Sequence, residues 1–444
     1  MKNLRIKSLT MVAALALGVS LFTGCGGGGS PGGTPSGGDT TTSTGGGGAA
    51  TTKYDLTFWV YSDFVQAEMG KIFNQWIDEF KAEHPEVNSI TMVPKNDADL
   101  LSSLMSGVGL PDMFSASARD MKKYYDAIEL LNIKSQFDGD DAFTKGFYPN
   151  ALSAVTVDDG IYAIPFISYI PVIYRNLNVL EKAGINPADG IPTFDAFLQQ
   201  LQKVKDAGVD PTHSWTNSGY FSPGAVMAAD APNITVGLQN SKTTVKPEQL
   251  VRTFETVKKI DAFGNQALSQ GSDAVIQAFQ TDKLGYMIDG PWIEPGVKAS
   301  GVKYDIQLVP PYEVGGWTGG LQGWDFMYGV TSKDEARNQL VGAFMKKMGS
   351  YNEQKDWMLR IGRSTLRADV MNDPAVVSSS PIAQISSAGL QKGMMQMDFG
   401  HSTVFWPSAM TDSVAKLGRG EISPADCAQQ FVDAINAMYA EAGE

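Results

Sequence analysis

The stretch Leu284-Gly285-Tyr286-Met287-Ile288-Asp289-Gly290-Pro291-Trp292 decides how the rest of the chain is interpreted. Its apolar residues predict a short buried strand that ends at Gly290. Pro291 stands where a helix would begin, because its fixed φ suits the first helical turn. Trp292 follows, and a large ring at a strand-to-helix junction of an α/β sheet stands where such sheets hold ligands. Taken alone, Trp292 is more simply an ordinary core residue, so the other segments have to decide.

Length, charge and cysteine content limit the class of protein. A chain of 444 residues is too long for one small core, so two compact units are expected. The net charge of −13 argues against nucleic acid and anionic lipid as partners. Only Cys25 and Cys427 occur, which excludes a disulfide framework. Cys427 falls in a helical pattern and is expected to be a buried or half-buried free thiol.

The N-terminus has the pattern of a secretion signal. Three basic residues precede an apolar run over 9–22, which predicts a signal peptide over 1–24. Residues 21–25 resemble a bacterial lipobox, which implies cleavage before Cys25 and a lipid on its sulfur. The alternative is a plain secretory signal with an incidental cysteine. Residues 25–52 are almost all Gly, Ser, Thr, Pro and Ala, and we expect them to be a flexible linker.

The first half of the folded part alternates between strand and helix patterns. Apolar runs predict strands over 54–60, 90–93 and 111–115, and helical spacing predicts helices over 65–80 and 97–105. This order is typical of a parallel sheet with crossover helices. Ligand groups in such sheets come from the loops that follow the strand ends. Those loops are Tyr61-Ser62-Asp63, Lys95-Asn96-Asp97 and Ser115 to Asp120.

The next segments have the pattern of a crossing between two domains. Strand patterns over 161–165 and 171–176 flank residues 166–170, and prolines at 165 and 171 limit continuous sheet pairing. We interpret 166–170 as a segment that passes from one domain to another. The residues that follow predict mostly helices, with few strands.

The order of these segments resembles a known family. It is similar to the extracellular solute-binding proteins that serve ABC importers, in the sugar-binding group related to maltose-binding protein. The matching segments are Gly109–Phe114, Tyr162–Pro165, Ile173–Asn176, Glu181–Ile185, Pro192–Asp195, Phe279–Met287, Gly290–Trp292, Arg360–Arg367 and Ser423-Pro424. Two departures, Arg175 where the family has tyrosine and Thr365 where it has proline, leave ligand contacts at these positions in doubt.

The resemblance implies an α/β fold with two lobes, a central ligand cleft and a hinge. Lobe one would comprise 53–165 and 303–367, and lobe two 166–302 and 368–444. The chain would cross between them near 165–171, 297–304 and 367–372. The residues alone support only the first crossing.

The same resemblance implies a receptor that captures a carbohydrate, most simply a neutral oligosaccharide, and delivers it to the permease of an importer. Aromatic rings stack on the apolar faces of a sugar, while carboxylates, amides and guanidinium groups bind its hydroxyls. The residues expected to bind ligand are Trp59, Asp63, Ser115, Asp120, Tyr169, Trp292, Trp324, Asp325, Arg367 and Trp406. Each has an alternative role in core packing, in a cap or at the surface.

Other functions have less support in the sequence. It has no His-Glu-x-x-His, Gly-x-Ser-x-Gly or Gly-Lys-Ser/Thr motif, and a glycosidase needs two carboxylates at a controlled separation, which sequence cannot show. Three widely spaced histidines disfavour a histidine metal site. The run Asp138-Gly-Asp-Asp141 lacks the sixth-position glycine and the terminal glutamate of a calcium loop, so we interpret it as a solvated turn. We therefore expect a monomer with no cofactor, no metal and no catalytic residue, which contacts the membrane only through Cys25.

Three alternatives remain open at this point. One is a surface glycoside hydrolase or lyase, and another is a receptor of the same fold for a peptide, polyol or uronate. The third is a sensor that passes its bound state to a signalling protein.

Overall fold

The first sheet forms around β1 (Tyr54–Tyr61), whose side chains alternate between its two faces. Leu56, Phe58 and Val60 are fully buried on one face. Strands β2 (Val87–Lys95) and β3 (Met113–Ser117) pair with β1 in parallel, as the sequence predicts. The strand order is β2-β1-β3-β12-β6, and β12 (Gly323–Gly329) runs antiparallel to its neighbours β3 and β6 (Ala163–Tyr169).

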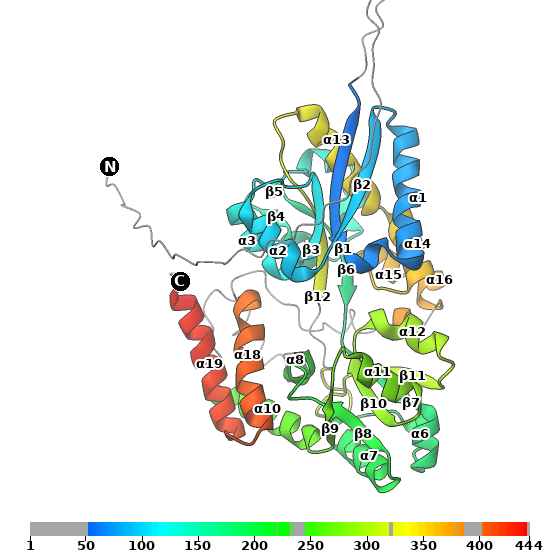
Figure 1. The fold of residues 1–444 in the computed structure, drawn as a ribbon, viewed down its shortest axis with the longest axis vertical. Helices are drawn as coiled ribbons and strands as arrows, with labels where there is room; N and C mark the ends of the chain where they lie inside the picture. The colour runs from blue at the N-terminus through cyan, green and yellow to red at the C-terminus, as the bar shows by residue number, and fades with distance from the viewer. Residues whose placement is uncertain are drawn as a thin grey trace, which may run out of the picture. The chain divides into compact units, whose positions relative to one another are not determined.

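Helices cover both faces of this sheet (Figure 1). On one face Phe73 and Trp76 of α1 (Ala67–Glu83) pack against Trp357 of α14 (Tyr351–Ile361). The other face carries Leu104 and Tyr124 from the helices after β2 and β3. Further helices of this part are α2 (Asp97–Ser106), α3 (Met121–Ala127), α4 (Asp141–Lys145), α5 (Pro149–Ala154) and α13 (Glu335–Met348). Strands β4 (Thr156–Val157) and β5 (Gly160–Ile161) form a small hairpin sheet.

The second sheet has the order β11-β7-β10-β8-β9. Its central strand β10 (Leu284–Asp289) is buried at every residue, as its apolar sequence predicts. The other strands are β7 (Val172–Asn176), β8 (Asp210–Ser214), β9 (Gly264–Ser269) and β11 (Tyr304–Leu308). The expectation of few strands here is wrong, because β8 and β9 are too polar to show a strand pattern in sequence.

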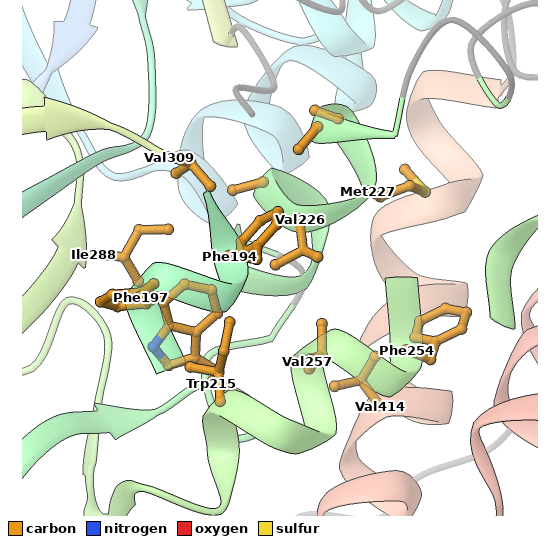
Figure 2. Close-up of a cluster of buried hydrophobic side chains, with 14 of the residues drawn as sticks. Phe194, Phe197, Trp215, Val226, Met227, Phe254, Val257, Ile288, Val309 and Val414 are labelled. Carbon is orange, nitrogen blue, oxygen red and sulfur yellow. The ribbon is translucent and has the colours of Figure 1, made fainter. Parts of the chain in front are cut away.

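The helices around the second sheet enclose a core centred on Phe197, Trp215 and Phe254 (Figure 2). Trp215 is fully buried here. Cys427 is a buried free thiol in the same core, as predicted. The helices are α6 (Leu177–Lys182), α7 (Phe194–Asp206), α8 (Phe221–Ala229), α10 (Pro247–Asp261), α11 (Asp273–Gln280), α12 (Glu294–Ala299), α18 (Ser402–Gly418) and α19 (Pro424–Glu441).

The crossings between the sheets differ from the predicted ones in detail. Pro165 does not interrupt pairing, because β6 is an edge strand, where a missing N–H is tolerated. The first crossing is therefore confined to Ile170-Pro171. Strand β11, which sequence placed in lobe one, pairs with β7 of the second sheet. Helices α15 (Ala368–Met371) and α16 (Pro374–Val377), placed in lobe two, pack on α14 of the first.

The computed structural model describes residues 52–219, 221–230, 234, 245–318, 323–379, 381–385 and 402–441. The predicted signal peptide, Cys25 and the linker up to residue 51 lie outside these residues, as do the side chains of Tyr169 and Trp406. No helix within the described ranges is long and apolar enough to cross a membrane. Below, lobe one means the elements around the first sheet and lobe two those around the second.

Candidate ligand-binding site

A pocket of about 630 Å³ takes its lining from both lobes. From lobe one come side chains at the carboxyl ends of strands, where ligands of α/β sheets gather. From lobe two come Trp292 and the residues around it. The lining residues are Tyr61, Ser62, Asp63, Lys95, Asn96, Ser117, Ile167, Ser218, Gly219, Phe221, Gln270, Pro291, Trp292, Asp325 and Arg363.

The lobe-one wall is polar and charged. All three strand-end loops singled out in the sequence contribute to it, through residues 61–63, 95–96 and Ser117. The carboxylate of Asp63 accepts a 2.6 Å hydrogen bond from the guanidinium of Arg363, which holds both groups at the pocket edge. Asp325, at the start of β12, brings a second carboxylate to this wall.

The lobe-two wall is aromatic. A helix begins at Pro291, as predicted: Trp292 lies in a short 3₁₀ helix, Pro291–Ile293, which leads directly into α12. Its ring is half-buried and meets Phe221 edge to face, with centroids 5.8 Å apart and planes at 66°. Aromatic pairs favour this arrangement. Phe221 therefore packs against the Trp292 indole, and both rings line the pocket.

Buried polar groups support the loop that brings Ser218 and Gly219 to the pocket. The Asp261 carboxylate accepts hydrogen bonds from the backbone N–H groups of Trp215 (2.7 Å) and Thr216 (3.1 Å) and from the Thr216 hydroxyl (2.9 Å). A carboxylate that satisfies several donors of one turn fixes its conformation. The loop after β8 is thus held from beneath by Asp261.

His213 supports the same loop from within the sheet. Its Nδ1 lies 2.8 Å from the carbonyl oxygen of Ser214, and its Nε2 accepts the backbone N–H of Ile288 at 3.3 Å. Nδ1 therefore carries the proton and the ring is neutral. Burial lowers the pKa of His213 to about 4, because the charged form would lose its hydration.

Gln270 and Asp289 form a further, part-buried polar contact on the lobe-two side of the pocket. The amide Nε2 of Gln270 donates a 2.8 Å hydrogen bond to Oδ1 of Asp289. The backbone N–H of Gln270 also donates to the Ser218 hydroxyl at 3.2 Å. Asp289 ends β10 and is fully buried, and this burial raises the pKa of its carboxyl group.

Three of the predicted ligand-binding residues, Asp63, Trp292 and Asp325, line this pocket. Trp324 does not, because strand alternation turns it into the core beside Phe326, opposite to Asp325. Trp59 packs half-buried on the same core, with the Lys95 ammonium 4.5 Å from its ring centre.

The remaining predicted residues with described side chains also lie away from the pocket lining. Ser115 is completely buried within β3, and Asp120 pairs with Lys123 at 2.9 Å. Arg367 is buried, donates to Asp369 at 2.6 Å and to the carbonyl oxygen of Gly349 at 3.0 Å, and so ties segments of lobe one together.

Several lining residues were not singled out as ligand-binding residues in the sequence. Lys95 and Ser117 lay in predicted loops, so strand-end position was a usable signal for them. Phe221, Gln270 and Ser218 follow polar segments with no strand pattern, and only the structure brings them together. Arg363 lay inside a family landmark, but its pairing with Asp63, 300 positions earlier, is a tertiary contact.

Two α/β lobes whose strand ends enclose one pocket define the class of two-lobe binding proteins. The chain belongs to the family of bacterial extracellular solute-binding proteins, because the model of that family matches residues 75–384. The resemblance inferred from the sequence motifs is thereby confirmed.

Individual relatives are distant but cover much of the chain. The lactose-binding protein of Rhizobium radiobacter is 22% identical over 299 residues, which are 64% of this chain and 69% of that protein. The maltotriose-binding protein of Pyrococcus abyssi is 24% identical over 326 residues, 70% and 67% of the two chains. The GacH receptor of Streptomyces glaucescens has a TM-score of 0.72 at 18% identity and covers 87% of this chain and 98% of its own. The last likeness confirms the predicted two-lobe fold.

Proposed function

We propose that this solute-binding protein captures a carbohydrate, most simply a neutral oligosaccharide, between its two lobes. The observation that carries the proposal is the contrast between the two walls of the pocket. Trp292 and Phe221 offer an aromatic surface on lobe two, and Asp63, Asn96 and Asp325 offer polar groups on lobe one. A sugar ring has apolar faces and a hydroxyl rim, so it is complementary to both walls.

Relatives support the same ligand class. The proteins reported above are named for lactose and maltotriose, and the GacH receptor was solved with acarbose. On this proposal the pocket residues bind the sugar without transforming it. The lobes close around the ligand by hinge motion at the crossings, and the closed protein delivers it to the permease of an ABC importer.

Binding and turnover can be tested together. Purified protein is titrated by calorimetry with lactose, maltotriose and triacetylchitotriose, and each sugar is then recovered and analysed by chromatography. Saturable binding with unchanged sugar supports the proposal. Cleavage products would instead favour a glycoside hydrolase or lyase. Binding only to a polyol, peptide or uronate would keep the receptor and change its ligand class.

We further propose that Cys25 carries a lipid and that residues 26–52 tether the folded part to the membrane surface. The support is the lipobox-like segment 21–25 and the low-complexity composition that follows it. The test is mass spectrometry of the N-terminal peptide from the membrane fraction. Cys25→Ala should move the protein out of that fraction, and membrane retention of this variant would refute the anchor.

A further inference from the structure

Asp289 is a fully buried carboxyl group that the binding function described so far does not use. It stands between β10 and the Gly290-Pro291-Trp292 turn, directly behind the lobe-two wall. Its Oδ1 accepts hydrogen bonds from Nε2 of Gln270 (2.8 Å) and from the backbone N–H of Gly290 (2.7 Å). Burial raises the pKa of this carboxyl group, and its polar neighbours Gly290, Gln270 and Trp292 partly oppose that rise.

This carboxyl group therefore holds a side chain that lines the pocket, because it accepts the hydrogen bond from the Gln270 amide. The backbone of Gln270 is fixed independently, because its N–H donates to Ser218. What remains to be set is the orientation of the Gln270 amide about its last bond. That orientation decides whether the ligand meets an acceptor or a donor.

The chemistry of the contact sets this orientation. An ionised carboxylate only accepts hydrogen bonds, so the amide atom 2.8 Å from Asp289 must be the nitrogen. The carbonyl oxygen of Gln270 then points to the other side of the amide. Among the described residues this oxygen receives no hydrogen bond from the protein, and it is left for a ligand.

We propose that Asp289 is a positioning residue that fixes the Gln270 amide with its carbonyl oxygen toward the ligand. The ligand is therefore recognised at this point through a hydroxyl that donates. This inference rests on the proposed carbohydrate-binding function. It specifies that, at Gln270, the protein accepts and the ligand donates the hydrogen bond. Protonated Asp289 could donate to the Gln270 oxygen, which would permit the reversed amide and present NH₂ to the ligand instead.

The surroundings of Asp289 define which other groups titrate near it. Tyr174 donates from its hydroxyl to the Gly290 carbonyl oxygen at 2.9 Å. His213 of the neighbouring strand β8 accepts a hydrogen bond from the backbone N–H of Ile288, the residue before Asp289. Burial raises the pKa of Tyr174, so it stays neutral at ordinary pH, whereas His213 titrates in acid. The charged groups of the opposite wall are Asp63, Lys95, Asp325 and Arg363. An acid effect on binding therefore has to be assigned by substitution.

The test variant is Asp289→Asn, with Asp282→Asn as the matched control. Asp282 precedes the same strand at its other end and accepts hydrogen bonds from the amides of Asn176 (2.9 Å) and Asn178 (3.1 Å), away from the pocket lining. Both substitutions replace a carboxylate that orients an amide. Only the first should affect the ligand.

Affinity is measured by calorimetry across a pH series, with whichever of lactose, maltotriose and triacetylchitotriose binds the wild type most tightly. Wild type and Asp282→Asn should lose affinity as pH falls through the pKa of Asp289. Asp289→Asn should bind roughly tenfold more weakly at neutral pH, the size of one lost hydrogen bond, and show a flatter pH profile. An unchanged dissociation constant and an unchanged profile in a folded Asp289→Asn protein would overturn the inference.

A ligand-free measurement keeps the inference testable if that variant does not fold. The side-chain ¹⁵N–¹H signals of Gln270, identified by their absence in Gln270→Glu, are followed against pH in the wild type. They should titrate with a pKa above that of an ordinary aspartate. Signals that do not respond to acid would overturn the inference. If none of the three sugars binds, the proposed function and the ligand part of the inference both fail, while these signals still decide the amide orientation.

Discussion

The indole of Trp292 lies directly over the Cα of Gly290, so that a Cβ atom at residue 290 would overlap Cζ3, Cη2 and Cε3 of the ring. Gly290 has an extended backbone with φ −86°, which any residue can adopt. The need for glycine is therefore steric and comes from the tryptophan. This contact explains why a glycine stands two residues before the tryptophan in the turn after β10.

Gly290→Ala should displace Trp292 and weaken ligand binding. The new Cβ atom would overlap the indole, so the ring has to move. Extra methyl groups in a tight contact cost about 1–3 kcal/mol. Calorimetry with the tightest-binding sugar measures the affinity, and near-ultraviolet circular dichroism reports the ring. Gly296→Ala in α12 is the control, since a Cβ there meets nothing within 4 Å. Equal affinities of the two variants would contradict the prediction.

Trp292→Ala should reduce affinity by about 1–2 kcal/mol, or roughly tenfold, while the protein stays folded. The indole is half-buried and belongs to the pocket wall, not to a core cluster. Tyr125→Ala is a suitable control. Tyr125 is a half-buried ring in an edge-to-face pair with Tyr162 and lines a different cavity. An unchanged dissociation constant by calorimetry would remove Trp292 from the site.

Much of the fold follows from patterns that a single sequence displays. The alternation of β1 and the helical spacing of α1 and α7 each reflect burial of one face, and the continuous apolar run of β10 reflects burial of both faces. Strands β8 and β9 do not follow from sequence, because their residues are polar. Their pairing depends on tertiary contacts, such as those of His213 and Asp261, that no local pattern records.

The site was predictable where it depends on strand ends and unpredictable where it depends on register. Residues 61–63 and 95–96 follow strands of a parallel sheet, so their meeting at the pocket could be foreseen. Trp324 and Asp325 are neighbours, and only the facing of β12 decides which one reaches the pocket. A one-residue change of register would exchange their roles, which is why sequence selected both.

Asp289→Asn should raise the thermal stability of the unliganded protein at neutral pH. Burial raises the pKa of this carboxyl in the folded state, so the folded protein holds its proton more tightly than the unfolded chain does. Stability from this group is therefore lost as pH rises, and a neutral side chain avoids that loss. Differential scanning calorimetry at pH 7.5 compares the variant with wild type and Asp282→Asn. A lower melting temperature than in both would contradict the prediction.

Cys427 should be unreactive in the native protein. It is completely buried beside α18, and burial raises the pKa of its thiol to about 12, so almost no thiolate forms at neutral pH. In a Cys25→Ala background, iodoacetamide should label Cys427 only in denaturant. Mass spectrometry over a urea series measures labelling, and its midpoint should coincide with that of unfolding by circular dichroism. Complete labelling of the native protein within minutes would be inconsistent with the buried position.

His213 should make lobe two sensitive to acid. Its pKa is about 4 in the folded protein and about 6.5 when exposed, so the unfolded chain binds a proton more readily. The stability that depends on neutral His213 is present above pH 6.5 and is lost as pH falls toward 4. The difference between the two pKa values corresponds to about 3 kcal/mol of unfolding free energy lost by pH 4.

His213→Gln should be less stable at pH 7.5 but lose less stability on acidification, as measured by urea unfolding at each pH. His84→Gln, at a partly exposed position in lobe one, should keep the acid sensitivity of the wild type. If His213→Gln loses as much stability between pH 6.5 and 4 as the wild type does, the acid sensitivity belongs to other groups.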